Sequence, residues 1–335
     1  TAEFAVPAGL AQGEYTLSVF SEQYNGDYNT DYVSNSFGVR FTVEKKPAEQ
    51  FDLTPGGKYY FDLSGMNIPG IVNGALPDST LHYVPFTYTG TVNSYVLKAA
   101  SDGVSGSSDS ASRVTDPSWE YGYTYPHSLF VADYTVTQRI GWDRLNEAGF
   151  IFGREYQSGN ISYTLRAPTV GSNRSGTVDS ENERGAPLRN EWDTVLDKNS
   201  GYIKNWAKTD SWGQDTSDAH AGVQALYRGY RGFTAARTWN DYPKGDNRIA
   251  YRPVLEVRNA AALGKNGLRA VTLNLGGSMP DGEDSIKIVV KSGESFTAPT
   301  SEGLPRPEGS SGDCFMWLGS NNRIYEPGDS VPETV

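Results

Sequence analysis

Hydrophobic and polar residues alternate along much of the chain, with the period of two that is typical of β-strands. Near the N-terminus this alternation covers residues 15–19 and 39–43, and it predicts two strands. Two strands do not form a stable domain by themselves. We therefore interpret residues 1–46 as the end of an incomplete β-sandwich, followed by the linker KKPAEQ.

Residues 51–259 form one predicted unit, in which β-type segments outnumber helical ones. Two stretches have helical period: residues 137–148, and residues 187–196, in which Trp192 lies on the apolar face and Glu191 lies near the positive end of the helix dipole. We expect the second helix to pack on a sheet. The strand candidates are KYYFDL, LHYVPFTY, SYVLKA, SLFVADYTV, ISYTLRA and AYRPVLEV.

After a spacer at residues 260–267, residues 268–335 contain short alternating segments separated by glycine and proline. This pattern predicts a small β domain. With 335 residues, the chain is long enough for two or three domains.

Composition narrows the class of protein. The chain has 21 Tyr, 7 Trp and a net charge of −11, which indicates a β-rich fold with an aromatic surface and disfavours nucleic-acid binding. The apolar runs are too short to span a membrane, so we expect no membrane insertion. Cys314 is the single cysteine, a usage that suits an exported bacterial surface protein. Because the sequence starts without Met or a signal peptide, we interpret it as part of a longer protein.

Four motifs carry a resemblance to a known family. LFVADYTVTQRIGWDRL, PLRNEWDTVL, YRGYRGFTAAR and YRPVLEV occur in that order, and together they resemble the formylglycine-generating-enzyme (sulfatase-modifying-factor) branch of the C-type lectin fold. The resemblance implies a C-type-lectin-like domain with two helices over residues 51–259. Those enzymes bind copper through a cysteine pair, and residues 51–259 contain no cysteine. We therefore expect a non-catalytic member and no enzyme activity.

The last segment resembles bacterial surface repeats of the Listeria–Bacteroides (internalin-B) type, through VTLNLGG and IYEPGDSV. That resemblance implies a β-grasp-like fold. The predicted fold class is therefore multidomain and mainly β with an α+β component: an incomplete immunoglobulin-like sandwich (1–46), a C-type-lectin-like domain (51–259) and a surface repeat (268–335).

Aromatic and arginine side chains are concentrated in the second half of the central unit. Aromatic rings stack on sugars and dominate protein contacts, and Arg donates planar hydrogen bonds. In the fold that the chain resembles, the loops before the closing strand form the ligand face. Part of the cluster, including Phe233 and Trp239, is expected in the core instead. The candidate ligand-binding residues are Trp206, Trp212, Tyr227, Tyr230, Arg231, Arg237, Asn240, Asp241, Tyr242 and Arg248.

Metal and cofactor sites have weak support in the sequence. The three histidines are far apart and lack zinc spacing. The WND tripeptide at residues 239–241 resembles the calcium-binding tripeptide of sugar-binding C-type lectins, yet the Glu-Pro-Asn or Gln-Pro-Asp loop of those lectins is absent. Calcium takes 6–8 oxygen ligands, so we interpret WND as a turn with a packed Trp. Asp27, Asn29 and Asp31 are interpreted as turn formers. We expect no metal and no cofactor, with calcium as the lesser alternative.

These observations together predict a secreted or cell-wall-attached protein of a Gram-positive bacterium. Its lectin-like domain is expected to act as an adhesin that binds an extracellular glycan or a host or bacterial surface protein. One alternative is a structural stalk, and another is an accessory module of a carbohydrate-active enzyme. An enzyme would instead require converging carboxylates, for which the candidates are Glu191, Asp193 and Asp215.

Overall fold

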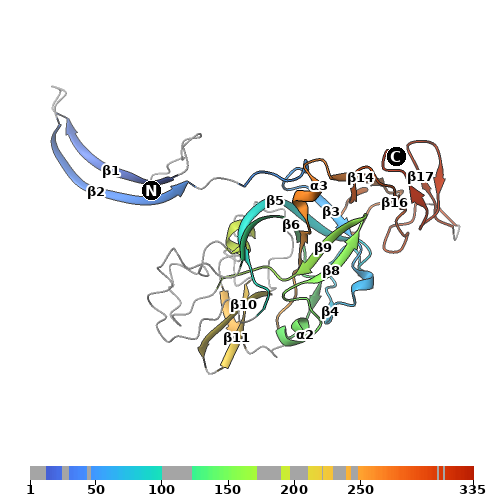
Figure 1. Ribbon diagram of the computed structural model, residues 1–335, viewed down its shortest axis with the longest axis horizontal. Helices are drawn as coiled ribbons and strands as arrows, with labels where there is room; N and C mark the ends of the chain where they lie inside the picture. The colour runs from blue at the N-terminus through green and yellow to red at the C-terminus, as the bar shows by residue number, and fades with distance from the viewer. Residues whose placement is uncertain are drawn as a thin grey trace. The chain divides into compact units, whose positions relative to one another are not determined.

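The computed structural model forms two compact units, Thr1–Pro47 and Ala48–Val335 (Figure 1). The described part of the chain is mainly β, with two short α-helices, α2 (Trp142–Glu147) and α3 (Ala260–Leu263). This confirms the mainly β class, while the finer family assignments stay predictions. The structure describes residues 13–24, 30–43, 47–99, 123–171, 190–196, 210–220, 222–228, 239–242, 248–307, 309–311 and 314–335.

The first unit contains an antiparallel hairpin of β1 (Gly13–Tyr24) and β2 (Thr30–Val43). Its register pairs Tyr15 with Phe41, and their rings stack at a centroid distance of 5.7 Å. The two strands predicted from alternation are therefore confirmed. Asp27 and Asn29 lie outside the described residues, and Asp31 lies in β2.

A curled six-stranded antiparallel sheet organises the second unit, in the order β3-β5-β6-β13-β9-β8 (Figure 1). All six strand candidates of the central unit fall on it, and two of them merge into the single strand β5. The strand β8 was not predicted, because its sequence REYQS has one buried residue in five. The bounds are β3 (Lys58–Phe61), β5 (Val84–Val96), β6 (Tyr123–Ala132), β13 (Val254–Val257), β9 (Ile161–Arg166) and β8 (Arg154–Ser158).

Aromatic rings fill the core on one face of this sheet. Phe61 is 1% exposed and packs edge-to-face against Phe86, Phe130 and Tyr163, with centroid distances of 5.3, 5.3 and 5.5 Å. Edge-to-face pairs of this kind add about 0.5–1.5 kcal/mol each to the energy of burial. Three strands from distant parts of the chain are thereby joined to β3.

The helix predicted at residues 137–148 was wrong at its start. Residues Thr137–Gln138 form the short strand β7, which pairs with β4 (Ile71–Val72), and α2 begins only at Trp142. Arg139 has a φ of 55°, a left-handed conformation that a continuous α-helix does not accommodate. The predicted apolar face is confirmed where the helix exists, since Trp142 and Leu145 are buried.

The helix predicted at residues 187–196 is described from residue 190 onward. There the chain forms a π-helical turn, η2 (Trp192–Leu196), in place of the expected α-helix. Trp192 and Val195 are buried against the main sheet beside Val131 and Val254, so the predicted packing on a sheet is confirmed.

A separate three-stranded sheet was not predicted. It consists of β10 (Ser211–His220), β11 (Gly222–Arg228) and β12 (Trp239–Tyr242), in that order. The interpretation of residues 239–241 as a turn was therefore wrong. Asn and Asp favour turns locally, but pairing with β11 outweighs that preference here.

The C-terminal part contains the antiparallel pair β14 (Leu268–Asn274) and β15 (Ser285–Lys291), which confirms the two longest strands expected there. Most buried residues of this pair belong to a second hydrophobic core. Leu268 and Val289 belong instead to the core of the six-stranded sheet. The two cores thus meet within one compact unit, and the division into domains at 51–259 and 268–335 stays a prediction. The remaining short elements are η1 (Ser64–Met66), β16 (Phe296–Thr297), β17 (Trp317–Leu318), β18 (Ile324–Tyr325) and β19 (Ser330–Val331).

Among the described residues, no helix has the length and apolar character required to cross a membrane.

Candidate functional site

The strands β9 and β13 are neighbours in the main sheet, with Arg166 opposite Val254, yet residues 167–253 separate them in the chain. We call this segment the β9–β13 connection. Antiparallel neighbours can be joined by a two-residue turn, so the topology of the sheet does not require its length. The connection includes every candidate ligand-binding residue named from the sequence.

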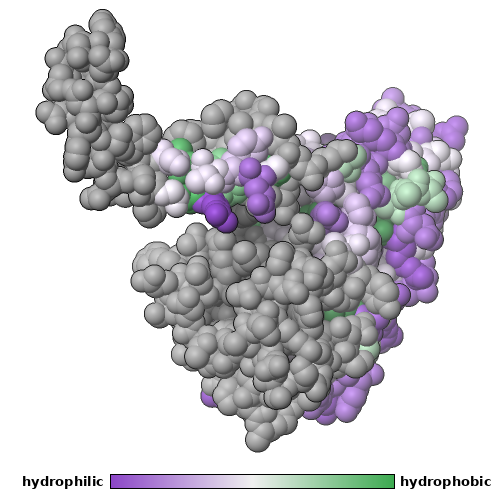
Figure 2. All heavy atoms as spheres, turned by 60° about the vertical axis from the view of Figure 1, so that its left-hand side comes forward, coloured by the Kyte–Doolittle hydropathy of each residue, from purple (hydrophilic) through white to green (hydrophobic). Residues whose placement is uncertain are grey.

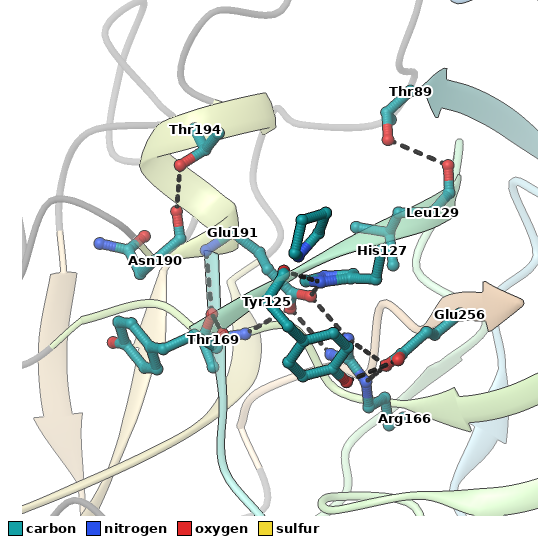
Figure 3. A network of polar contacts seen from close by, with 12 residues as sticks. Thr89, Tyr125, His127, Leu129, Arg166, Thr169, Asn190, Glu191, Thr194 and Glu256 are labelled. Atoms are coloured by element: carbon teal, nitrogen blue, oxygen red, sulfur yellow. Dashed lines mark hydrogen bonds and ion pairs between the residues drawn. The ribbon is translucent and has the colours of Figure 1, made fainter. Parts of the chain in front are cut away.

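A buried ion pair holds the start of the connection. Arg166 ends β9, and its two terminal nitrogens donate to the two carboxylate oxygens of Glu191 at 2.8 and 2.6 Å (Figure 3). Nε and Nη2 of Arg166 also donate to Oε2 of Glu256, in β13, at 3.1 and 2.9 Å. The side chains of Arg166 and Glu191 are both 1% exposed. One guanidinium thus joins β9, β13 and the turn at residue 191.

Two residues of β6 complete this charged network. Tyr125 Oη donates to Oε1 of Glu256 at 2.6 Å. His127 places Nε2 at 2.8 Å from Oε1 of Glu191 and Nδ1 at 2.9 Å from the carbonyl oxygen of Tyr125. Carboxylate and carbonyl oxygens only accept, so both bonds form together when both ring nitrogens carry a proton. Figure 3 shows Tyr125 and His127 beside the side chains of Arg166, Glu191 and Glu256.

The backbone of the turn is also bonded to residue 169. Glu191 N donates to Oγ1 of Thr169, and Trp192 N donates to the carbonyl oxygen of Thr169, at 2.9 and 3.0 Å. In return, Thr169 N donates to Oε2 of Glu191 at 2.9 Å. Two parts of the connection that are more than 20 residues apart in sequence are therefore fixed to each other and to the sheet.

A second buried carboxylate anchors the first half of β10. Asp215 is 2% exposed, accepts from Tyr95 Oη at 2.7 Å and accepts from the backbone N of Val170 at 2.7 Å. Its neighbour Gln214 accepts from Leu97 N at 2.9 Å and donates to the carbonyl oxygen of Ile151 at 3.0 Å. The middle of the connection is thus also bonded to the main fold.

The two carboxylates have opposite pKa shifts. Burial alone would raise the pKa of Glu191, but the charge and hydrogen bonds of Arg166 outweigh it and lower the pKa from 4.5 to about 2. At Asp215 burial dominates, and it raises the pKa from 3.8 to about 6. Glu191 is accordingly ionised throughout the physiological pH range. Asp215 gains or loses its proton near pH 6.

These shifts predict how the stability of residues 48–335 depends on pH. The ionised Glu191 stabilises the fold above pH 4.5, and this contribution is lost as the pH falls toward 2. Ionisation of the buried Asp215 lowers the free energy of unfolding. This loss of stability is complete above pH 6 and disappears as the pH falls toward 3.8. Each group changes the free energy of unfolding by about 3 kcal/mol, so together they favour maximal stability near pH 4–5. Urea denaturation between pH 2 and pH 8 measures this profile.

The matched control for the pH profile is Asp215→Asn, which retains the shape of the side chain and cannot ionise. The stability of this variant should stay level between pH 5 and pH 7, where that of the wild-type chain falls. A wild-type slope that persists in the variant would contradict the role of Asp215.

The described residues place the predicted ligand-binding residues in different surroundings. Trp212 is fully buried and donates from Nε1 to the carbonyl oxygen of Ile140 at 2.7 Å, so it is a core residue and not part of an exposed face. Arg248 is exposed. Residues 240–242 lie in β12, directly opposite residues 225–227 of β11. The cross-strand pairs are Asn240 with Tyr227, Asp241 with Leu226, and Tyr242 with Ala225. Trp206, Tyr230, Arg231 and Arg237 lie outside the described residues.

The described part of the chain contains no group of three His, Cys, Asp or Glu residues that could hold a metal ion. Of the carboxylates considered for catalysis, Glu191 and Asp215 are buried and bond to different side chains, Arg166 and Tyr95, and the side chain of Asp193 is outside the description.

The charged network was missed in the sequence, although it left a signal. Arg166 ends the apolar segment ISYTLRA, and Glu256 interrupts YRPVLEV. A charge inside a strand that is otherwise apolar requires a buried partner. That signal identifies buried ion pairs but does not say which residues pair.

No protein-family model matches this chain, and neither a curated protein nor a solved structure matches it.

Proposed function

We propose that this protein is the recognition part of a bacterial cell-surface protein, and that the β9–β13 connection binds an extracellular glycan or surface protein without catalysis. The observation that carries the proposal is the connection itself. It extends over residues 167–253 between strands that are hydrogen-bonded neighbours. Long connections on a rigid scaffold are the usual place for binding residues.

The anchoring of the connection supports binding. Its residues at 169, 191 and 215 are fixed to the sheet by buried hydrogen bonds of 2.7–3.1 Å to Tyr95 and Arg166. A segment whose base is fixed before binding loses less conformational entropy when a ligand binds. The charges in this base are nearly all buried, so they position the connection and do not contact a ligand themselves.

The state of the buried carboxylates supports a role without catalysis. Glu191 accepts hydrogen bonds from Arg166, from the backbone of Thr169 and from His127. Both oxygens of Asp215 also accept bonds, one from Tyr95 and one from Val170. A general base needs an oxygen within reach of a substrate proton, and at 1–2% exposure neither carboxylate offers one.

The resemblance to the non-catalytic C-type-lectin-like fold belongs to the same proposal. The YRPVLEV motif supplies β13 at the centre of the sheet, and the VTQ…W motif supplies β7 and α2. Residues 268–335 are proposed as a surface repeat, and residues 1–46 as part of an immunoglobulin-like sandwich. A secreted or cell-wall-attached location follows from this proposal.

A glycan array probed with the full chain, with calcium and with chelator, tests the function. The double variant Arg237→Ala/Tyr242→Ala should lose at least about tenfold in affinity, because Arg and aromatic side chains dominate binding energy. Arg323→Ala is the control, since Arg323 is exposed and lies outside the connection. Equal binding by the double variant would contradict the proposed face. The absence of binding to any glycan, and to extracellular proteins in a second array, would favour a stalk.

A further inference from the structure

A groove of about 660 Å³ lies in the C-terminal part of the second unit, apart from the β9–β13 connection. One wall is formed by residues 271–276, and the opposite wall by residues 315–320. Its volume is in the range of ligand pockets, about 300–1,000 Å³.

The first wall is the open edge of a strand. Residues 271–274 belong to β14, which pairs on one side with β15 and has no second neighbour among the described strands. Successive side chains of a strand point to opposite faces of the sheet. Six consecutive residues can therefore line one groove only if the groove follows the backbone edge.

The hydrogen-bond pattern identifies the groups on this edge. Leu275 N donates to Asp284 O at 2.9 Å and Ser292 N to Gly267 O at 3.0 Å, and these bonds lie at the two ends of the β14–β15 ladder. Bonded pairs alternate along an antiparallel ladder, so residues 269, 271 and 273 bond to β15. The N–H and C=O groups of Ala270, Thr272 and Asn274 point outward, and no bond to them occurs within the described part of the chain.

Over residues 270–274 this edge has neither a bulge nor a Pro or Lys residue that would protect it against strand pairing. Unpaired edges are commonly protected by a bulge, by Pro or by Lys. The register of β14 with β15 has no shift from Leu268 to Asn274, and residues 270–276 contain neither Pro nor Lys. In the described part of the chain, Pro307 packs on Gly276 at the far end of the edge and leaves no room for a Cβ.

The opposite wall is apolar and held in place. Trp317 donates from Nε1 to the carbonyl oxygen of Pro299 at 2.9 Å, and its ring lies edge-on to that of Phe315 at 4.9 Å. Met316 and Leu318 are 49% and 72% exposed. Green spheres gather among purple ones on the right-hand side of Figure 2, the side on which Figure 1 draws the C-terminal strands. Among the described residues that line the groove, none is Asp, Glu, Lys or Arg, although the chain has a net charge of −11.

We propose that this groove binds an extended, uncharged peptide segment of another protein, which adds to the edge of β14 as a further strand. The outward donors and acceptors recur at every second residue, a spacing that an extended backbone matches. Main-chain bonds of this kind supply affinity in strand addition, while the side chains on the groove side contact the apolar wall. A charged segment is disfavoured, because an ion would lose water without gaining a partner.

The test uses a fluorescein-labelled, capped heptapeptide of alternating Thr and Val, with fluorescence anisotropy of the full chain as the measurement. Saturable binding is expected. The same peptide with N-methyl groups on every second residue keeps its side chains and loses one set of donors, and it should bind at least about tenfold more weakly. No binding of the first peptide, or equal binding of both, would overturn the proposal.

Two variants locate the peptide on the protein. Leu318→Asp places a charge in the groove and should weaken binding at least about tenfold. Ile324→Asp is the matched control: Ile324 is the cross-strand partner of Leu318, is 65% exposed and does not line the groove, so its effect should stay below about twofold. Both positions are exposed, so both variants should fold. Equal effects of the two variants would overturn the proposal, as would a dimer in solution formed through β14.

Discussion

Replacing Arg166 with Met is expected to lower the free energy of unfolding of residues 48–335 by about 3–5 kcal/mol. Methionine fills most of the volume of the side chain but leaves Glu191, at 1% exposure, without its cation. Glu256 loses the same partner. The measurement is urea denaturation followed by tryptophan fluorescence, which reports on this unit because all 7 tryptophans lie within it.

Two comparisons separate the loss of a buried charge from a general effect of substitution. Lys265 forms an ion pair with Asp52 at 3.2 Å with side chains 64% and 57% exposed, so Lys265→Met should cost less than about 1 kcal/mol. The double variant Arg166→Met/Glu191→Met should be more stable than the sum of its single changes predicts, since no unpaired carboxylate remains at residue 191. Strict additivity would show that the two residues are not coupled.

Replacing Phe61 with Ala should also cost about 3–5 kcal/mol. The ring is 1% exposed and packs against four other aromatic rings from β5, β6, β8 and β9, so its removal leaves a cavity that the sheet cannot close. The same denaturation experiment measures the effect.

Ile71→Ala is the control for Phe61, because this side chain is 60% exposed and should contribute less than about 0.5 kcal/mol. A loss below about 1 kcal/mol for Phe61→Ala would mean that the aromatic cluster does not hold the sheet together.

The sequence predicted the strands that bury apolar side chains and missed the polar ones. The strands β5, β9 and β13 are mostly buried, so their apolar residues stand out. In contrast, β10 has the sequence SWGQDTSDAH, which lacks apolar alternation. Its early residues are buried through hydrogen bonds, such as those of Gln214 and Asp215. Periodicity in hydrophobicity contains no information about such bonds.

The site was predicted in one respect and missed in another. Aromatic and Arg composition drew attention to residues 206–248, which lie within the β9–β13 connection. The base of that connection depends on Arg166 and Glu191, which are 25 residues apart in sequence. Neither residue has a local pattern that identifies its partner, because the pairing follows from the order of strands in the sheet. Trp212 was assigned to the ligand face by composition, which cannot separate a buried ring from an exposed one.

The central claim is that the main sheet is a scaffold and that the β9–β13 connection binds the ligand. The most direct test removes residues 217–247 and joins residue 216 to residue 248 with about twelve Gly and Ser residues. Trp212 N donates to Ala250 O at 3.0 Å, and the bridge between residues 211 and 250 is parallel, so the linker has to span the six extended residues between this contact and the two ends, about 20 Å. We expect the free energy of unfolding to change by less than about 1 kcal/mol and glycan or protein binding on the arrays to disappear. Binding that persists in the shortened chain, or a shortened chain that does not fold, would contradict the account.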